Sequence, residues 1–337
     1  MAGWNLKNGV ITDYCCSDDC LWSLFNHVFS DSSRKRNTYK FGFIKALLDN
    51  LFNGFNTAEG LFLSYGQIFG RFTENYWNLV VRYNLRQMRS DGRSQFSRLE
   101  IILNEAVGSN PVCAFLEFDS LDFIRKTEII GKVADECRKY VIGALYEDFD
   151  GVIYSFDLNG SGLTVNRCVY EFMLRHKSEL EKLNYYAWAK FLEKINSGNA
   201  AVYLLDKLEA ATPRRGDLSV YRAILRKEFE ENNCFYCGKK LGGRVHVDHF
   251  IPWSFVRDDK LWNFVLACPS CNEKKNNRLP KHDLLIRIEE RNRTIMQSDD
   301  SLVQKDFENY SDDLPSRIWK YAKLSGLKEF QDNSRSA

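Results

Sequence analysis

The sequence predicts an α+β protein with a mainly α-helical N-terminal module and a small mixed domain closer to the C-terminus. Three observations lead to this prediction. Apolar residues recur at helical spacing through most of residues 1–200. The pattern changes to strand-like alternation in residues 244–250, inside a segment flanked by paired cysteines. The chain has 337 residues, of which 44% are hydrophobic, which is enough for two domains with their own cores.

Helical stripes of apolar residues define the N-terminal module. The spacing predicts helices over residues 38–53, 64–85, 94–107, 166–183 and 185–195, with residues 110–137 mostly helical. Residues 140–158 alternate in a way that predicts a β-hairpin, with Asp150-Gly151 at its turn. We therefore expect a helical module that contains little sheet.

An arginine-rich stretch follows the second of these helices. Arg86, Arg89 and Arg93 lie among polar residues there, which makes them candidates for a second nucleic-acid contact or an effector-sensing surface. A solvated helix end is an equally good interpretation.

Composition also suggests the domain boundaries. Residues 197–216 are rich in Gly, Ala, Thr, Pro and Arg, which is typical of a linker. We divide the chain into a helical module (1–200), a small domain (201–285) and a helical C-terminal extension (286–337). The acidic residues between 299 and 313 are interpreted as an exposed linker within that extension.

Four cysteines occur as two CxxC pairs, Cys234/Cys237 and Cys268/Cys271. A CxxC turn brings two thiolates to one ion, and two such turns complete a tetrahedral zinc site. Four thiolates leave no coordination position open, so this zinc is structural. It would stabilise a segment whose apolar core is too small to fold alone.

Between the pairs, residues 244–250 form a predicted strand that ends before Pro252, and residues 261–268 form a second. A short helix is expected to begin just after Cys271. This strand–strand–helix unit carries an Asp248-His249 pair together with Asn263 and Asn272.

Residues 234–280 resemble the HNH, or ββα-metal, endonucleases, in an H-N-N variant with a four-cysteine zinc site. The resemblance implies that Asp248 and Asn272 hold a catalytic Mg²⁺ or Mn²⁺ ion and that His249 is the general base. It implies that Asn263 fixes the loop that presents His249.

The residue types suit this chemistry independently of the family. A carboxylate and an amide oxygen form a sparse set of hard ligands, as Mg²⁺ prefers. An imidazole with a pKa near ~6.5 is largely neutral at pH 7 and can accept a proton from water. The expected activity is hydrolysis of DNA phosphodiester bonds. The alternatives are an RNA-cleaving nuclease and a zinc-stapled nucleic-acid-binding protein without cleavage.

The charge of the chain is concentrated in this segment. The whole chain carries a formal net charge of +2, whereas residues 234–281 contain nine Lys and Arg against four acids. Such a local excess favours phosphate binding. The candidate nucleic-acid contacts are Arg244, His246, Lys274 and Lys275. The alternative for the arginine and the two lysines is a solvent-exposed face without a ligand. The alternative for His246 is a structural role.

The sequence contains no apolar run long enough to span a membrane and no N-terminal leader pattern. Its ten cysteines are too sparse for a disulfide scaffold, so we expect a cytoplasmic protein without a membrane partner. The layout resembles restriction and anti-phage defence nucleases. That resemblance implies DNA as the partner and a defence-system partner protein. One metal and one base cut one strand at a time, so cutting a duplex requires a homodimer or two visits.

Overall fold

The structure is a computed structural model that describes residues 5–90, 94–108, 117–211, 217–227 and 232–330. The chain divides into two units, Met1–Pro213 (unit 1) and Arg214–Ala337 (unit 2). The protein is α+β: both units are rich in helix, and each contains a small antiparallel sheet. Within the described ranges, none of the helices combines the length and apolar character needed to cross a lipid bilayer.

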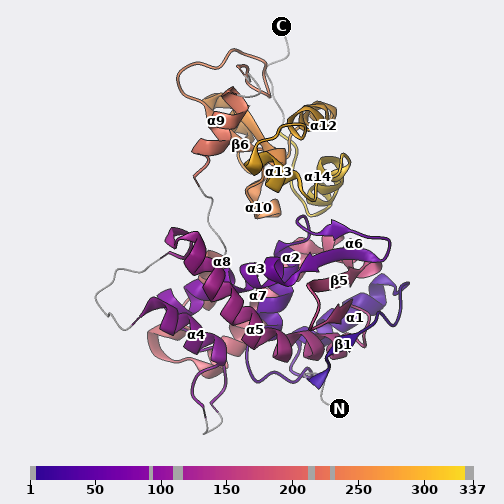
Figure 1. Ribbon diagram of the computed structural model, residues 1–337, viewed down its shortest axis with the longest axis vertical. Helices are drawn as coiled ribbons and strands as arrows, with labels where there is room; N and C mark the ends of the chain where they lie inside the picture. The colour runs from indigo at the N-terminus through magenta and orange to yellow at the C-terminus, as the bar shows by residue number, and fades with distance from the viewer. Residues whose placement is uncertain (1–4, 91–93, 109–116, 212–216, 228–231, 331–337) are drawn as a thin grey trace. The chain divides into compact units, whose positions relative to one another are not determined.

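Unit 1 consists of helices around a five-stranded sheet (Figure 1). Its helices and helical turns are α1 (Asp18–Phe29), α2 (Tyr39–Asp49), α3 (Tyr65–Trp77), η2 (Asn78–Arg82), α4 (Arg98–Val107), η3 (Phe118–Ser120), α5 (Phe123–Asp148), α6 (Arg167–Arg175), α7 (Lys177–Ile195), η4 (Gly198–Ala201) and α8 (Leu204–Ala210). Its strands are β1 (Asn8–Gly9), β2 (Phe55–Asn56), β3 (Gly60–Ser64), β4 (Tyr154–Asp157) and β5 (Gly162–Asn166).

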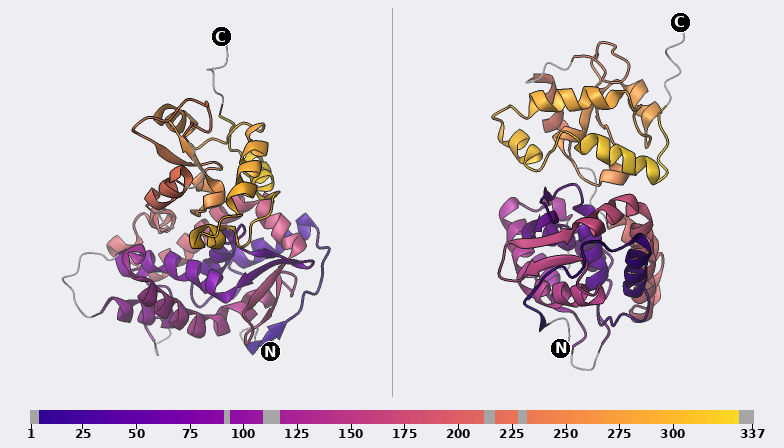
Figure 2. Two further views of the ribbon diagram at one scale, coloured as in Figure 1. Left: turned by 45° about the horizontal axis from the view of Figure 1, so that its top comes forward. Right: turned by 90° about the vertical axis from the view of Figure 1, so that its right-hand side faces the viewer.

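The sheet has the order β1-β4-β5-β3-β2, and all its described pairs are antiparallel. Helices α3 and α5 pack against it (Figure 2). At the start of β3, Gly60 has a φ of +155°, and a Cβ there would lie 1.9 Å from the Val165 carbonyl oxygen. Only glycine allows this close approach of β3 to β5. Directly after β3, a Ser64–Gln67 capping box begins α3.

The predicted hairpin over residues 140–158 is wrong. Residues 140–148 belong to α5, whose buried Val141, Ile142 and Leu145 continue its helical stripe. The Asp150-Gly151 pair, with φ of +50° and +77°, ends the helix instead of turning a hairpin. The hairpin lies later, where β4 and β5 pair across the turn at Asn159-Gly160.

Unit 2 contains two paired strands, β6 (His246–His249) and β7 (Phe264–Ala267), followed by α11 (Pro269–Lys275). Helix α9 (Ser219–Lys227) packs against both strands, and α10 (Trp253–Val256) and η5 (Leu261–Asn263) lie in the connection between them. Three further helices follow: α12 (Leu284–Ile295), α13 (Ser301–Phe307) and α14 (Leu314–Leu324).

The C-terminal helices are attached to the strand–strand–helix segment by side-chain contacts with its backbone. Asn292 donates to the Trp262 carbonyl (2.9 Å), and the Trp319 indole donates to the Pro280 carbonyl (2.9 Å). Helices α12 and α14 also pack against each other (Figure 2).

The acidic stretch between residues 299 and 313 is not an exposed linker. The Asp300 carboxylate caps α13, and the buried Asp306 carboxylate accepts from the Leu261 backbone N–H (2.7 Å). Asp306 therefore fixes the start of η5, the helical turn that leads directly into β7.

Candidate active site

The four cysteines of unit 2 come together. Their sulfur atoms all lie within 4.8 Å of one another. Cys234 and Cys237 lie on a turn completed by Gly238, which has a φ of +71°, whereas Cys268 and Cys271 lie at the start of α11. The Cys268 backbone N–H points at the Cys234 sulfur (3.4 Å). This compact set of four thiols suits a tetrahedral zinc ion.

The thiols differ in how readily they lose their protons. Burial raises the pKa of Cys237 and of Cys271. Burial also acts upward on Cys234, but backbone N–H groups of Cys237, Cys268 and Tyr236 outweigh it and lower the pKa of that thiol. Because a metal ion binds thiolates, raised pKa values at Cys237 and Cys271 mean that binding an ion would release protons from these thiols.

Asp248 lies on β6 and is fixed by two donors. The Tyr236 hydroxyl donates to its Oδ2 atom (2.6 Å), and the Lys275 ammonium lies 3.0 Å from the same oxygen. Burial, and then the negative charge of Asp248, raise the pKa of Tyr236 well above its usual range, so the phenol keeps the proton that it donates. Both contacts fall on one oxygen of the carboxylate.

Lys275 has no exposed surface, and its ammonium also donates to the His249 backbone carbonyl (2.7 Å). This lysine therefore joins α11 to β6 at the Asp248-His249 pair. Its burial does not support the predicted contact with nucleic acid.

Asn272 and His246 lie beside Asp248. His246 and Asp248 are two residues apart on β6, so their side chains share a face of the strand. The amide of Asn272, on α11, lies 3.1 Å from His246 Nδ1. A carboxylate, an amide and an imidazole are thus gathered on one side of the strand pair.

His249 is held by a carboxylate. His249 is only 4% exposed, and its Nε2 atom lies 2.8 Å from Asp259 Oδ1. Its ring packs edge-on against Phe264, with ring centroids 4.7 Å apart. Because a carboxylate only accepts hydrogen bonds, Nε2 carries the proton and the lone pair of the neutral ring lies on Nδ1.

Asn263 fixes the backbone just after His249. Its side-chain oxygen accepts from the Ile251 N–H (2.8 Å), and its amide donates to the Ile251 carbonyl (2.9 Å). The Asn263 carbonyl also accepts from the Phe250 N–H (2.7 Å). Asn263 is 1% exposed, so these are buried contacts that hold the loop in one conformation.

The order of these residues along the chain matches that of a known enzyme family. The sequence pattern of HNH endonucleases matches residues 234–281, from the first zinc cysteine to just beyond α11. This segment is an HNH domain. The match supports nuclease activity. No curated protein and no solved structure matches the chain at a significant level.

The remaining predicted contacts of the HNH domain differ in exposure. Arg244 and Lys274 are exposed, and His246 is half-buried. A cavity of about 340 Å³ lies beside β6 and is lined by Arg244, His246 and Arg222 of α9. Two guanidinium groups and an imidazole therefore face one hollow next to Asp248.

Two of the arginines predicted in unit 1, Arg86 and Arg89, contact other residues of that unit. Arg86 is half-buried, donates to the Gln95 carbonyl and lies 5.4 Å from the centroid of the Phe96 ring. Arg89 is exposed and lies 5.2 Å from the Phe191 ring centroid. Arg93 lies outside the described residues.

Sequence reasoning missed three residues of the site: Asp259, Tyr236 and Arg222. Asp259 lies in a loop with no periodic pattern, ten positions after His249, where only the return of the chain brings it to the imidazole. Tyr236 lies between the first two cysteines, and this position by itself suggests only that its side chain packs against the turn that carries them. Arg222 lies on the helix that precedes the domain, and only the packing of α9 on the strands brings it near Arg244.

Proposed function

We propose that this protein is a metal-dependent endonuclease that hydrolyses DNA phosphodiester bonds, with His249 as the general base. The observation that carries the proposal is the contact between Asp259 and His249, the residue that follows Asp248 on β6, in a segment with the HNH pattern. The imidazole has one nitrogen fixed by a carboxylate and the other able to accept a proton.

The chain's own groups account for the proton transfer. Nδ1 of His249 accepts a proton from a water molecule, whose oxygen attacks the phosphorus atom as the bond to the 3′ oxygen breaks. Asp259 stabilises the imidazolium that forms and keeps the ring in its orientation. The products carry a 5′-phosphate and a 3′-hydroxyl, whose proton comes from solvent.

The donor set fits the two metals implied by the family. Four clustered thiols suit structural zinc. Asp248 and Asn272, together with His246, suit one Mg²⁺ or Mn²⁺ ion, because the two contacts of Asp248 both fall on Oδ2. When bound, such an ion neutralises charge on the scissile phosphate and the departing oxygen.

Basic side chains support a nucleic-acid substrate. Arg244 and Arg222 line the hollow beside His246, and the exposed Lys274 follows Asn272 on α11. These groups are suited to phosphates on either side of the scissile bond. They contact no base edge that would separate DNA from RNA, so RNA cleavage is an outcome of the test below.

One base and one catalytic ion cut one strand per engagement. Cutting a duplex therefore requires a homodimer or two binding events. In the proposed biological role, restriction or anti-phage defence in the cytoplasm, unit 1 or a partner protein of the defence system directs the HNH domain to its target.

A plasmid nicking assay tests the proposal. Supercoiled DNA and a structured RNA are incubated with the full chain, with and without Mg²⁺ or Mn²⁺. We expect nicked DNA only with the divalent ion, and His249→Ala should lower the rate by at least about 100-fold.

The matched control is His282→Ala, which changes an exposed histidine of unit 2 away from the site. It should nick like the wild type. Both variants should retain the zinc content of the wild type. Cleavage of RNA alone would replace DNA as the substrate, and undiminished nicking by His249→Ala would refute the role of the base.

A further inference from the structure

Unit 1 contains a cavity that the nuclease mechanism does not use. Its volume is about 1250 Å³, and it is lined by α1, by the segment 32–40 and by the last turns of α5. Cavities of roughly 300–1,000 Å³ or more accommodate small-molecule ligands. The chemistry of the lining indicates which ligand class fits.

One wall of the cavity carries consecutive basic residues. Arg34, Lys35 and Arg36 all line it, as does Lys40, whose charge is balanced by Asp148 at 2.6 Å. In the described part of the chain, the Lys35 ammonium forms no ion pair and donates instead to the carbonyls of Ser30 (2.6 Å) and Ser33 (3.2 Å). Burial, and then the nearby Lys40 charge, lower the pKa of Lys35 to about 8. An anion bound at this wall would stabilise its charged form.

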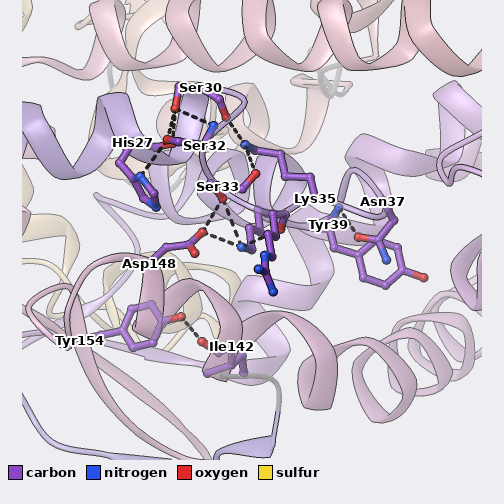
Figure 3. A network of polar contacts seen from close by, with 12 residues as sticks. His27, Ser30, Ser32, Ser33, Lys35, Asn37, Tyr39, Ile142, Asp148 and Tyr154 are labelled. Carbon is purple, nitrogen blue, oxygen red and sulfur yellow. Dashed lines mark hydrogen bonds and ion pairs between the residues drawn. The ribbon is translucent and has the colours of Figure 1, made fainter. Parts of the chain in front are cut away.

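Hydroxyl groups stand beside these cations (Figure 3). Ser30 and Ser32 share a hydrogen bond of 2.5 Å, and Ser32 Oγ lies 3.0 Å from His27 Nδ1. Ser33 donates to Asp148 (2.8 Å), the same carboxylate that pairs with Lys40. Cations next to hydroxyl groups form a typical environment for phosphate oxygens.

The lining also contains apolar and acidic side chains. Leu24 of α1 and Tyr140, Val141 and Ala144 of α5 provide an apolar surface, and the Tyr140 side chain is 41% exposed. Carboxylates of Glu147 and Asp150 lie at the end of α5 and in the turn after it. An aromatic base can pack on such a surface and donate its N–H groups to carboxylates.

We propose that this cavity binds a nucleoside phosphate, with its phosphate at Arg34–Arg36 and its base along the Tyr140 side of α5. The lining combines basic side chains with an apolar surface and carboxylates, so neither inorganic phosphate nor a nucleoside alone would use all of these groups. The site is separate from the HNH domain and does not depend on the proposed nuclease activity.

Isothermal titration calorimetry on the full chain tests the proposal. ATP, GTP, CTP and UTP are each titrated up to about 1 mM, alongside inorganic phosphate, adenosine, guanosine, cytidine and uridine. We expect at least one nucleotide to bind with a 1:1 stoichiometry, and at least tenfold more tightly than phosphate or its own nucleoside.

Charge-reversal variants locate the binding. Arg34→Glu should weaken it at least tenfold, and Lys35→Ala should weaken it as well. Lys182→Glu, with the same change of charge on the exposed surface of α7, is the control and should bind like the wild type. Arg244→Glu reports whether the nucleotide occupies the phosphate-binding side chains of the HNH domain instead; nucleotide binding that survives this change belongs to the cavity of unit 1.

The proposal fails if no nucleotide binds, or if inorganic phosphate binds as tightly as the nucleotides do. It also fails if Arg244→Glu abolishes binding while Arg34→Glu retains it, because the nucleotide would then occupy the HNH domain. Arg34→Glu must give the same circular dichroism spectrum as the wild type, which shows that the variant is folded. Lys35→Ala is a second, independent variant at the same wall of the cavity.

Discussion

Asp259→Asn tests whether the carboxylate against His249 contributes to the reaction. The substitution preserves the size of the side chain and its ability to bond to Nε2, 2.8 Å away, but removes the negative charge. An asparagine can also donate to Nε2 through its amide, which would move the ring proton to Nδ1 and block the base. We therefore expect a loss in kcat, the rate of the chemical step.

The minimum loss follows from the burial of the pair. The His249 side chain is 5% exposed and that of Asp259 is 20% exposed, so water screens the interaction only in part. A hydrogen bond to a charged partner contributes about 1.5–3 kcal/mol, against about 0.5–1.5 kcal/mol between neutral groups. Loss of the charge alone should thus cost the imidazolium formed in the transition state about 1–2 kcal/mol, equivalent to about a 5- to 30-fold fall in kcat. A ring proton moved to Nδ1 would lower kcat further.

Steady-state nicking of plasmid DNA measures kcat and KM separately. The matched control is Asp258→Asn, because Asp258 uses its carboxylate to accept from the Asp259 N–H (2.9 Å), a bond that asparagine can also make. We expect wild-type kcat in the control and an unchanged KM in both variants. An Asp259→Asn enzyme with full kcat, or with a change in KM alone, would refute the positioning role of Asp259.

Three further predictions concern stability. Cys268→Ser removes one of the four sulfurs and should release zinc and unfold unit 2, as measured by zinc-to-protein ratio and circular dichroism. Asn263→Ala leaves the buried N–H and carbonyl of Ile251 without partners, which should cost about 2–4 kcal/mol in chemical denaturation. Burial raises the pKa of Glu100 above 4.5, so its ionised form destabilises the fold as pH rises through the folded pKa. Glu100→Gln keeps an oxygen that can accept from the Ser97 N–H. Its melting temperature should therefore equal that of the wild type at about pH 4 and exceed it at pH 7. Equal melting temperatures at both pH values would contradict this.

The sequence predicted best the parts of the fold that depend on local spacing. The predicted helices over residues 38–53 and 64–85 contain α2 and α3, because their apolar stripes are long and helical. The cysteine pairs and Asp248-His249 could be found because their chemistry is tied to short, fixed intervals.

The sheet of unit 1 was largely missed for the opposite reason. β1 and β2 have two residues each and carry no alternation, and their pairing partners lie far along the chain or across a glycine turn. The Asp150-Gly151 pair is compatible with a hairpin turn or a helix end, and only the burial of α5 decides between them. Asp259 likewise acquires its role through the fold and not through its neighbours in sequence.

Helix α11 unites two functions in seven residues. Its N-cap residue Cys268 and its first-turn residue Cys271 supply two sulfurs of the four-cysteine cluster. The following residues supply Asn272 and the buried Lys275, which bonds to β6 at Asp248 and His249. Chelation or thiol oxidation would therefore displace an amide donor and a strand anchor in the same event. Loss of the structural ion and loss of catalysis should consequently be thermodynamically linked, even though no sulfur takes part in the hydrolysis.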